Sequence, residues 1–306
     1  MTASNVHTFT LTRNEIITEA LELTATIDIG SPVPPEVMES CARSLNLYAK
    51  SWQTKGLFLH TYKPATLFLT TGQQSYLLGP TGDHATESYV ETTLTADAAA
   101  LDTVLAVTSE TGINVADKIG IILSDNSIHW DTVASLAPLT LTTGIVGASV
   151  NGNSVYTYTT KIIRPIKITD VLHVTDNVEQ PITKISLSEY KELTNKDTES
   201  QPVQYAYDPQ LDDSRLYVWP VADNGKQRIN FTYQKPVDDF TTDSDTATMP
   251  TDWLQCFTIG LAWTIAPKRL VPLSEQQALK LRYEEALRDL DDFEESSVFF
   301  QPARRR

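Results

Sequence analysis

Hydrophobic residues near the start of the chain repeat at the spacing of an α-helix. Thr12 and Glu15 form a capping-box pattern, in which each side chain can accept a hydrogen bond from a backbone N–H at the start of a helix. Gly30 and the proline-rich segment 32–35 separate this helix from a second one. The apolar face of the second helix comprises Val37, Met38, Cys41, Leu45, Tyr48 and Trp52. The pattern predicts an antiparallel helical pair.

The same spacing returns near the end of the chain. Pro250 opens a third helix, with Trp253, Phe257, Leu261 and Ile265 on one face. Ser274 and Gln277 form another capping-box pattern before a final helix. The apolar stripe of that helix comprises Leu279, Tyr283, Ala286, Leu287, Leu290 and Phe293. We expect the two helical regions to pack together, because each stripe must be buried against another element.

Between the helical regions, the pattern changes to short strands. Residues 65–70 alternate, and residues 75–78 read as the returning strand after a turn at Gly72. Further strand-like runs lie at 162–169, 171–174, 216–219 and 229–233, and a short helix is expected at 188–193. Asp223-Asn224-Gly225 predicts a hairpin between the last two runs, because Asn-Gly tolerates positive φ angles.

Residues 88–161 differ in composition from their surroundings. This stretch is rich in Thr, Ala, Val and Ile, and Lys118 and Lys161 are its only basic residues. Its strand-like runs are 103–108, 119–123, 128–133, 139–142 and 155–159. Short strands separated by regular turn signals predict an inserted small β-barrel or sandwich.

The expected fold is therefore α+β, with a β-sheet middle region between helical ends. The predicted parts are a helical body at 1–56 and 250–296, a β-rich region at 57–87 and 162–249, an inserted β domain at 88–161, and an extended tail at 297–306.

Charge and cysteine content narrow the functional classes. The 306 residues carry 24 basic and 39 acidic side chains, a net charge of −15. A nucleic-acid-binding surface of Lys and Arg on phosphates is therefore not expected. The cysteines, Cys41 and Cys256, lie far apart, which favours a reducing compartment over a disulfide scaffold. Neither a membrane span nor a secretory leader is expected, since the longest apolar runs are short and residues 1–10 lack a basic, then apolar, pattern.

The sequence contains no recognisable catalytic, cofactor or metal motif. The five histidines, His7, His60, His84, His129 and His173, show no metal-ligand spacing and are interpreted as structural or surface residues. Asp243-Ser244-Asp245 begins like a calcium loop, but Ala247 stands where an oxygen ligand belongs. Two carboxylates suffice for glycoside hydrolysis, and 39 acidic residues make that signal uninformative. We expect no enzyme activity and no cofactor.

Two features near the end of the chain are unusual. The final helix is acidic on its outer side, which indicates either a solvated face or a subunit or channel surface; the acidic residues are Glu284, Glu285, Asp289, Asp291, Asp292, Glu294 and Glu295. The tail then combines apolar and basic residues: Val298, Phe299, Phe300, Gln301, Pro302, Arg304, Arg305 and Arg306. It is either a frayed terminus or a peptide that becomes ordered on a partner.

The order of short motifs resembles head-to-tail adaptor proteins of short-tailed bacteriophages. This family includes the packaged-DNA stabilisation proteins and is similar in role to tail tubular protein A. The resemblance covers about residues 9–80 and 162–303. Its motifs lie at 12–17, 45–47, 51–57, 72–79, 189–190, 216–220, 233–236, 250–253, 261–262 and 299–302.

The resemblance implies a structural protein of the virion neck or tail, made in the host cytoplasm. Such adaptors form a dodecameric ring beneath the portal, extend the DNA channel, help retain packaged DNA and support the tail nozzle. The implied partners are the portal and nozzle proteins, with tail fibres or spikes for residues 88–161. Double-stranded DNA would pass without specific binding, and the portal-docking residues would be those of the tail, Val298 to Arg306.

Three other interpretations remain open from the residues alone. The chain could be another neck or tail component, such as a nozzle or stopper. It could be a cell-wall hydrolase carried in the virion. It could also be a carbohydrate-binding module on a helical stalk, with Trp130 as the sugar platform, although a single Trp in a strand is more often a core residue.

Overall fold

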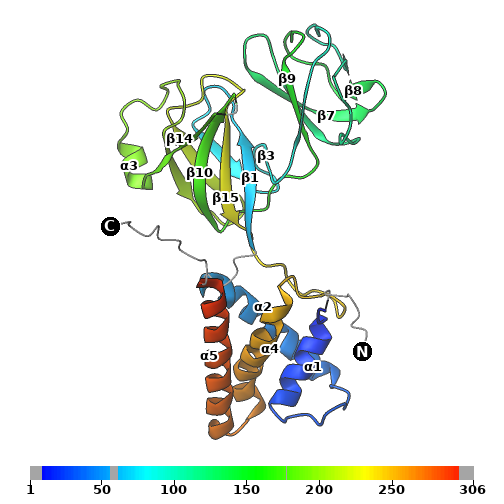
Figure 1. Cartoon of the computed structure of the whole chain (residues 1–306), viewed down its shortest axis with the longest axis vertical. Coiled ribbons are helices and arrows are strands. Elements are labelled where there is room, and N and C mark those ends of the chain that lie inside the picture. The colour runs from blue at the N-terminus through cyan, green and yellow to red at the C-terminus, as the bar shows by residue number, and fades with distance from the viewer. Residues whose placement is uncertain (1–8, 56–60, 177, 296–306) are drawn as a thin grey trace, which may run out of the picture. The chain divides into compact units, whose positions relative to one another are not determined.

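The chain divides into two compact units. The computed structural model describes residues 9–55, 61–176 and 178–295 (Figure 1). One unit comprises Met1–His60 and Val237–Arg306, and the other comprises Thr61–Pro236. The first unit is helical and the second consists mainly of β-strands, so the predicted α+β class is confirmed.

The helical unit is organised around a central helix. Its elements are α1 (Arg13–Leu23), α2 (Pro35–Lys55), α4 (Thr251–Ile265), the 3-10 helix η2 (Ala266–Arg269) and α5 (Leu273–Glu295). Helix α4 packs against α1, α2 and α5. Trp52 and Phe257 lie in the shared core, with ring centroids 5.2 Å apart. A Cβ at Gly260 would overlap the hydroxyl of Tyr48, so the small residue allows α2 and α4 to approach closely.

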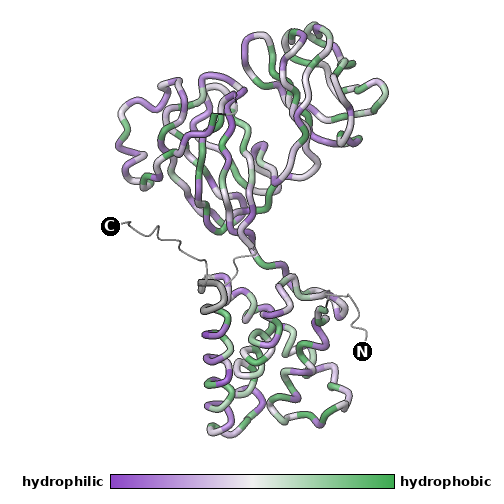
Figure 2. Tube along the Cα trace, viewed as in Figure 1, coloured by the Kyte–Doolittle hydropathy of each residue, from purple (hydrophilic) through white to green (hydrophobic). Residues whose placement is uncertain are grey.

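The boundaries of the helices follow local chemistry, with one correction. The predicted capping box of α1 is confirmed, because the Thr12 N–H donates to Glu15 Oε2 at 2.8 Å and the Glu15 N–H donates to Thr12 Oγ1 at 3.3 Å. The predicted cap at Ser274 is wrong, because α5 already begins at Leu273. The carbonyl of Pro272 instead accepts hydrogen bonds from the N–H groups of Glu275 and Gln276. Hydrophilic and hydrophobic positions alternate along α5 (Figure 2), as expected for a helix with one buried face.

The main part of the β unit contains two sheets that share a core. The first sheet has the order β11 (Val178–Pro181), β10 (Lys167–Thr175), β15 (Arg228–Gln234), β1 (Tyr62–Phe68) and β3 (Ala85–Thr86). The second has the order β12 (Thr183–Lys184), β13 (Gln204–Asp208), β14 (Ser214–Trp219) and β2 (Ser75–Leu78). Leu67 and Tyr233 of the first sheet belong to the same buried cluster as Leu216 and Val218 of the second. Helix α3 (Leu187–Glu192) contacts β13.

A third sheet is formed by the strands that lie between β3 and β10 in the sequence. Its order is β4 (Val90–Thr93), β9 (Ser154–Tyr158), β6 (Lys118–Ile122), β7 (Ile128–Ser135), β8 (Leu139–Leu141) and β5 (Val104–Leu105). Each of the five strand-like runs expected in this region overlaps one of these strands. The sheet encloses its own apolar cluster, which includes Ile119, Ile121, Leu139 and Val155. We call these strands and their loops the β module.

Aromatic side chains join the β module to the first sheet. We call this contact the aromatic seam; it comprises Phe68, Tyr89, Trp130, Tyr156 and Tyr158. Phe68 is almost completely buried, and its ring centroid lies 5.0 Å from that of Tyr156 and 5.2 Å from those of Tyr89 and Trp130. Tilted and edge-on pairs at these distances are favourable beyond the area that they bury.

Two polar residues are built into the seam. The ring of His84 stacks on Trp130 with centroids 3.8 Å apart, and its Nδ1 lies 2.7 Å from the hydroxyl of Tyr158. Arg228 donates to the hydroxyl of Tyr89 and to Glu91 Oε2, both at 3.1 Å. The half-buried Trp130 ring therefore packs against His84 and Phe68, which favours a packing role for this residue over a carbohydrate platform.

The two hairpins that the sequence predicts in the main sheets, 65–70 with 75–78 and 216–219 with 229–233, do not form. Strand β2 pairs with β14, whereas β1 pairs with β15 and β3, so the run at 75–78 does not return beside β1. Strands β14 and β15 also lie in different sheets. Gly225 does not form a turn between paired strands. It allows the backbone to approach the β module closely, because its N–H donates to the carbonyl of Asn126 and a Cβ would lie 2.7 Å from the nitrogen of Ile128.

Candidate binding groove

The residues predicted to dock on a partner lie outside the described part of the chain. These are Val298, Phe299, Phe300, Gln301, Pro302, Arg304, Arg305 and Arg306. Of the acidic side chains predicted on the outer side of the final helix, Glu284, Glu285 and Asp289 are exposed on α5.

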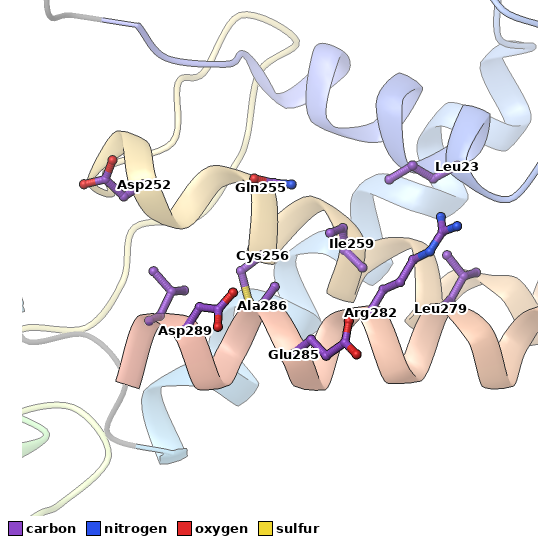
Figure 3. A pocket seen from close by; sticks show the side chains of 11 residues that line it. Leu23, Asp252, Gln255, Cys256, Ile259, Leu279, Arg282, Glu285, Ala286 and Asp289 are labelled. Carbon is purple, nitrogen blue, oxygen red and sulfur yellow. The ribbon is translucent and has the colours of Figure 1, made fainter. Parts of the chain in front are cut away.

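A groove runs along the helical unit between α1 and α5, with α4 as its floor (Figure 3). Its volume is about 870 Å³. The apolar lining comprises Leu23, Cys256, Ile259, Leu279, Ala286 and Leu290, and the polar lining comprises Asp252, Gln255, Arg282, Glu285 and Asp289. We call this surface the helical groove.

Helical spacing explains why these side chains meet. On α4, Asp252, Cys256 and Ile259 recur at intervals of four and three residues, so they share a face. That face differs from the Trp253 and Phe257 face, which packs against Trp52 of α2. Helix α4 is therefore apolar on two sides, and only one of them is covered by α2.

The rim of the groove is acidic. Asp252, Glu285 and Asp289 are exposed, and none of them forms an ion pair or hydrogen bond with another described residue. Arg282 is the single basic residue in the lining, and it likewise has no ion pair among the residues described. Unpaired carboxylates beside an apolar floor favour a ligand that is both apolar and basic.

A second hollow of about 380 Å³ continues the apolar surface toward the start of α1. It shares Leu23, Gln255 and Ile259 with the groove. Phe9 and Leu11 extend its lining, and the exposed carboxylate of Glu19 stands beside them. The side chain of Phe9 is 65% exposed, so an apolar patch remains open to solvent at this end.

The described residues contain no group of three or more His, Cys, Asp and Glu side chains that could hold a metal ion. Burial lowers the pKa of His84, to about 3, and also the pKa values of His129 and His173. These three rings are therefore neutral at pH 7. Cys41 and Cys256 are both buried thiols.

The Asp243-Ser244-Asp245 segment also has a structural role. Asp243 forms an ion pair with Arg13 at the start of α1. Asp245 accepts hydrogen bonds from Thr242 and Thr241, which lower the pKa of its carboxyl group. The interpretation of this segment as a loop without calcium chemistry is consistent with these contacts. In the described residues, no helix has both the length and the apolar character needed to cross a bilayer.

Sequence reasoning missed the helical groove. The sequence contains one weak indication of the groove. Cys256 and Ile259 are apolar but do not belong to the helix face that carries Trp253, so α4 is apolar on a second side. The gap between α1 and α5 depends on how the helices pack, and a periodic pattern carries no information on that spacing.

Comparison with known proteins gives the family. A family model described as SU10 adaptor protein matches residues 128–306, which is more than half of the chain. The match begins at β7 of the β module and continues through α4 and α5. No curated protein matches the chain. The chain belongs to the SU10 adaptor protein family, and it is therefore a phage adaptor-type protein.

Proposed function

We propose that the protein forms a ring beneath the portal, connects the phage head to the tail and extends the DNA channel. The observation that carries this proposal is the family match over residues 128–306. In this role it helps to retain packaged DNA and provides the platform for the tail nozzle. Its location is the virion neck, after synthesis in the host cytoplasm.

The parts of the chain have different tasks in this proposal. The ring-forming body comprises 1–56 and 250–296, which supply α1, α2, α4 and α5. Residues 57–87 and 162–249 form the β-rich region. The inserted domain at 88–161 faces outward and contacts tail fibres or spikes, because a folded module would block a channel. The C-terminal residues 297–306 dock on the portal.

The net charge of −15 supports passage of DNA without specific binding. A channel with few exposed Lys and Arg side chains does not hold phosphates, so DNA can slide through it during ejection. A tight, salt-sensitive affinity of the assembled ring for double-stranded DNA would contradict this part of the proposal.

The experiment is light scattering of the purified protein alone and after mixing with its portal ring. We expect a complex in which the copy number of the adaptor equals that of the portal. A ring of different copy number would instead favour a nozzle or stopper, and absence of any association would overturn the proposal.

Deletion of residues 298–306 tests the role of the tail. We expect the truncated protein to lose portal binding while it remains folded, because every core contact described above lies within residues 9–295. Circular dichroism and thermal unfolding provide the control for folding. Portal binding at the affinity of the full chain would show that the tail is not the docking segment.

A further inference from the structure

The helical groove has the chemistry to bind a segment that is both apolar and basic. Its floor is formed by α4, where Cys256 is buried and Ile259 is half-buried, and the half-buried Leu23 of α1 stands beside it. The groove and the adjoining hollow carry the carboxylates of Glu19, Asp252, Glu285 and Asp289 against the single guanidinium of Arg282. The excess is three negative charges in a surface of mixed apolar and polar character.

One segment of this chain has the complementary composition. Residues 298–300 are Val-Phe-Phe, and residues 304–306 are three arginines. Two phenylalanines bury roughly 150–250 Å² each when they enter a pocket. The three arginines equal the acidic excess of the groove in number and are opposite to it in sign. We propose that, in the free protein, the helical groove holds the chain's own residues 296–306.

The length of this segment suits the position of the groove. Asp289 and Leu290 line the groove six and five residues before Glu295, where α5 ends, which corresponds to about 9 Å of helix. Phe299 follows Glu295 by four residues, and an extended chain covers about 13 Å over that distance. The chain must reverse direction after α5, and Ser296 and Ser297 are residues that tolerate turns.

The direction of the segment also fits the order of the groove residues. Asp252 and Asp289 lie at the end of the groove nearest the end of α5, and Leu279 lies at the other end (Figure 3). A segment running back along α5 would place its aromatic residues over Cys256 and Ile259. Its arginines would then reach the side of the groove formed by α1, where Glu19 is exposed.

This arrangement has a consequence for assembly that rests on the proposed function. If the same residues dock on the portal, the groove and the portal compete for one segment. The free protein would then hide its docking segment until a portal displaces it. The groove itself would be vacated at the same moment and become available within the ring.

Paired cysteines in the full chain test the proposal directly. Ala303→Cys, which is not one of the named docking residues of the tail, is combined with Gln255→Cys, which is exposed in the groove, and the protein is oxidised mildly at low concentration. The control combines Ala303→Cys with Leu47→Cys, which is 71% exposed on α2 and does not line the groove. Peptide mapping by mass spectrometry separates these crosslinks from any that involve Cys41 or Cys256.

We expect the groove pair to form an intramolecular disulfide roughly tenfold faster than the control pair, because docking raises the effective concentration of the two thiols. Glu285→Lys should slow this reaction, whereas Glu275→Lys, an exposed carboxylate of α5 outside the groove, should not. Equal rates for the two cysteine pairs would overturn the proposal. A disulfide between two copies would also overturn it and would identify a second copy as the occupant.

Portal binding separates this proposal from the proposed function. The crosslinked groove pair should lose portal binding, and a reductant should restore it. Fast crosslinking without any portal binding in the reduced protein would support the groove contact and contradict the portal role of the tail. Unaltered portal binding by the crosslinked protein would show that the groove does not withhold the segment.

Discussion

The aromatic seam and the helical groove are both apolar surfaces edged by charge, and they differ in what covers them. In the seam, Phe68 is packed among the rings of Tyr89, Trp130 and Tyr156. The cation at its edge, Arg228, is paired with Glu91. In the groove, Ile259 remains half-buried and the carboxylates of Asp252, Glu285 and Asp289 have no described partner.

The difference indicates two uses of apolar surface. A filled surface with paired charges gains its free energy when the chain folds, so it holds two parts of one unit together. An open surface with unpaired charges is buried and neutralised only when a ligand binds, so its apolar area and charges contribute to binding and not to folding. Substitutions in the seam should therefore change stability, whereas substitutions in the groove should change binding.

The strongest test of the comparison is Phe68→Ala. Loss of this buried ring should lower the free energy of unfolding of the β unit by about 3–5 kcal/mol, because it removes the aromatic contacts and leaves a cavity. Ile259→Ala, on the half-buried groove floor, should cost about 1 kcal/mol or less. Urea denaturation with hydrogen exchange would measure both. Similar losses for the two variants would remove the distinction between seam and groove.

A smaller effect is expected from Arg228→Met, which keeps most of the side-chain stem but removes the guanidinium. The Arg228 side chain is 6% exposed and lies 5.1 Å over the ring of Tyr156. The substitution leaves Glu91 without its partner, at a cost of about 1–3 kcal/mol. Arg282→Met in the groove is the matched control, and we expect its stability to be close to that of the wild type. Equal melting temperatures for all three proteins would show that the pairing of Arg228 adds nothing.

The smallest effect is a pH dependence of the seam. Burial, together with the positive charges of Lys161 and Lys118, lowers the pKa of His84 to about 3. The unfolded chain binds this proton near pH 6.5, so unfolding takes up a proton between these two values and stability falls as the pH falls. We expect stability to fall by about 1.5 kcal/mol between pH 6.5 and 5.

His84→Phe isolates this contribution, because it retains a ring that can stack on Trp130 and cannot titrate. The difference in unfolding free energy between the two proteins, measured at several pH values, cancels the contributions of His129, His173 and the carboxylates. Parallel curves for wild type and variant would contradict the assignment to His84.

Local chemistry made much of the fold predictable. The capping box at Thr12 and the stripe of α2 depend on residues within one or two turns, so the sequence alone was sufficient. Strand partners were not predictable in the same way. The run at 216–219 and the run at 229–233 are close in sequence, yet they join different sheets because their partners come from β2, β13, β1 and β10.

Gly225 illustrates why a strong local signal failed. Asn224-Gly225 has the composition of a hairpin turn, but the glycine is needed where the backbone approaches Asn126 and Ile128 of the β module. That contact spans about a hundred residues of sequence, and no window around Gly225 contains it. The helical groove escaped prediction for the same reason, because it arises between α1 and α5, the first and last described helices of the chain.

The joining of α1 and α2 with α4 and α5 in one core also affects how the protein is made. A ribosome that has synthesised α2 must complete the whole β unit, Thr61–Pro236, before α4 emerges. At about 5–20 residues per second, this interval is on the order of ten to forty seconds. During that time the apolar faces of α1 and α2 lack their partners, while the β unit has all of its own. The helical unit, which contains α1 and α2, can therefore complete its core only after the β unit has been synthesised.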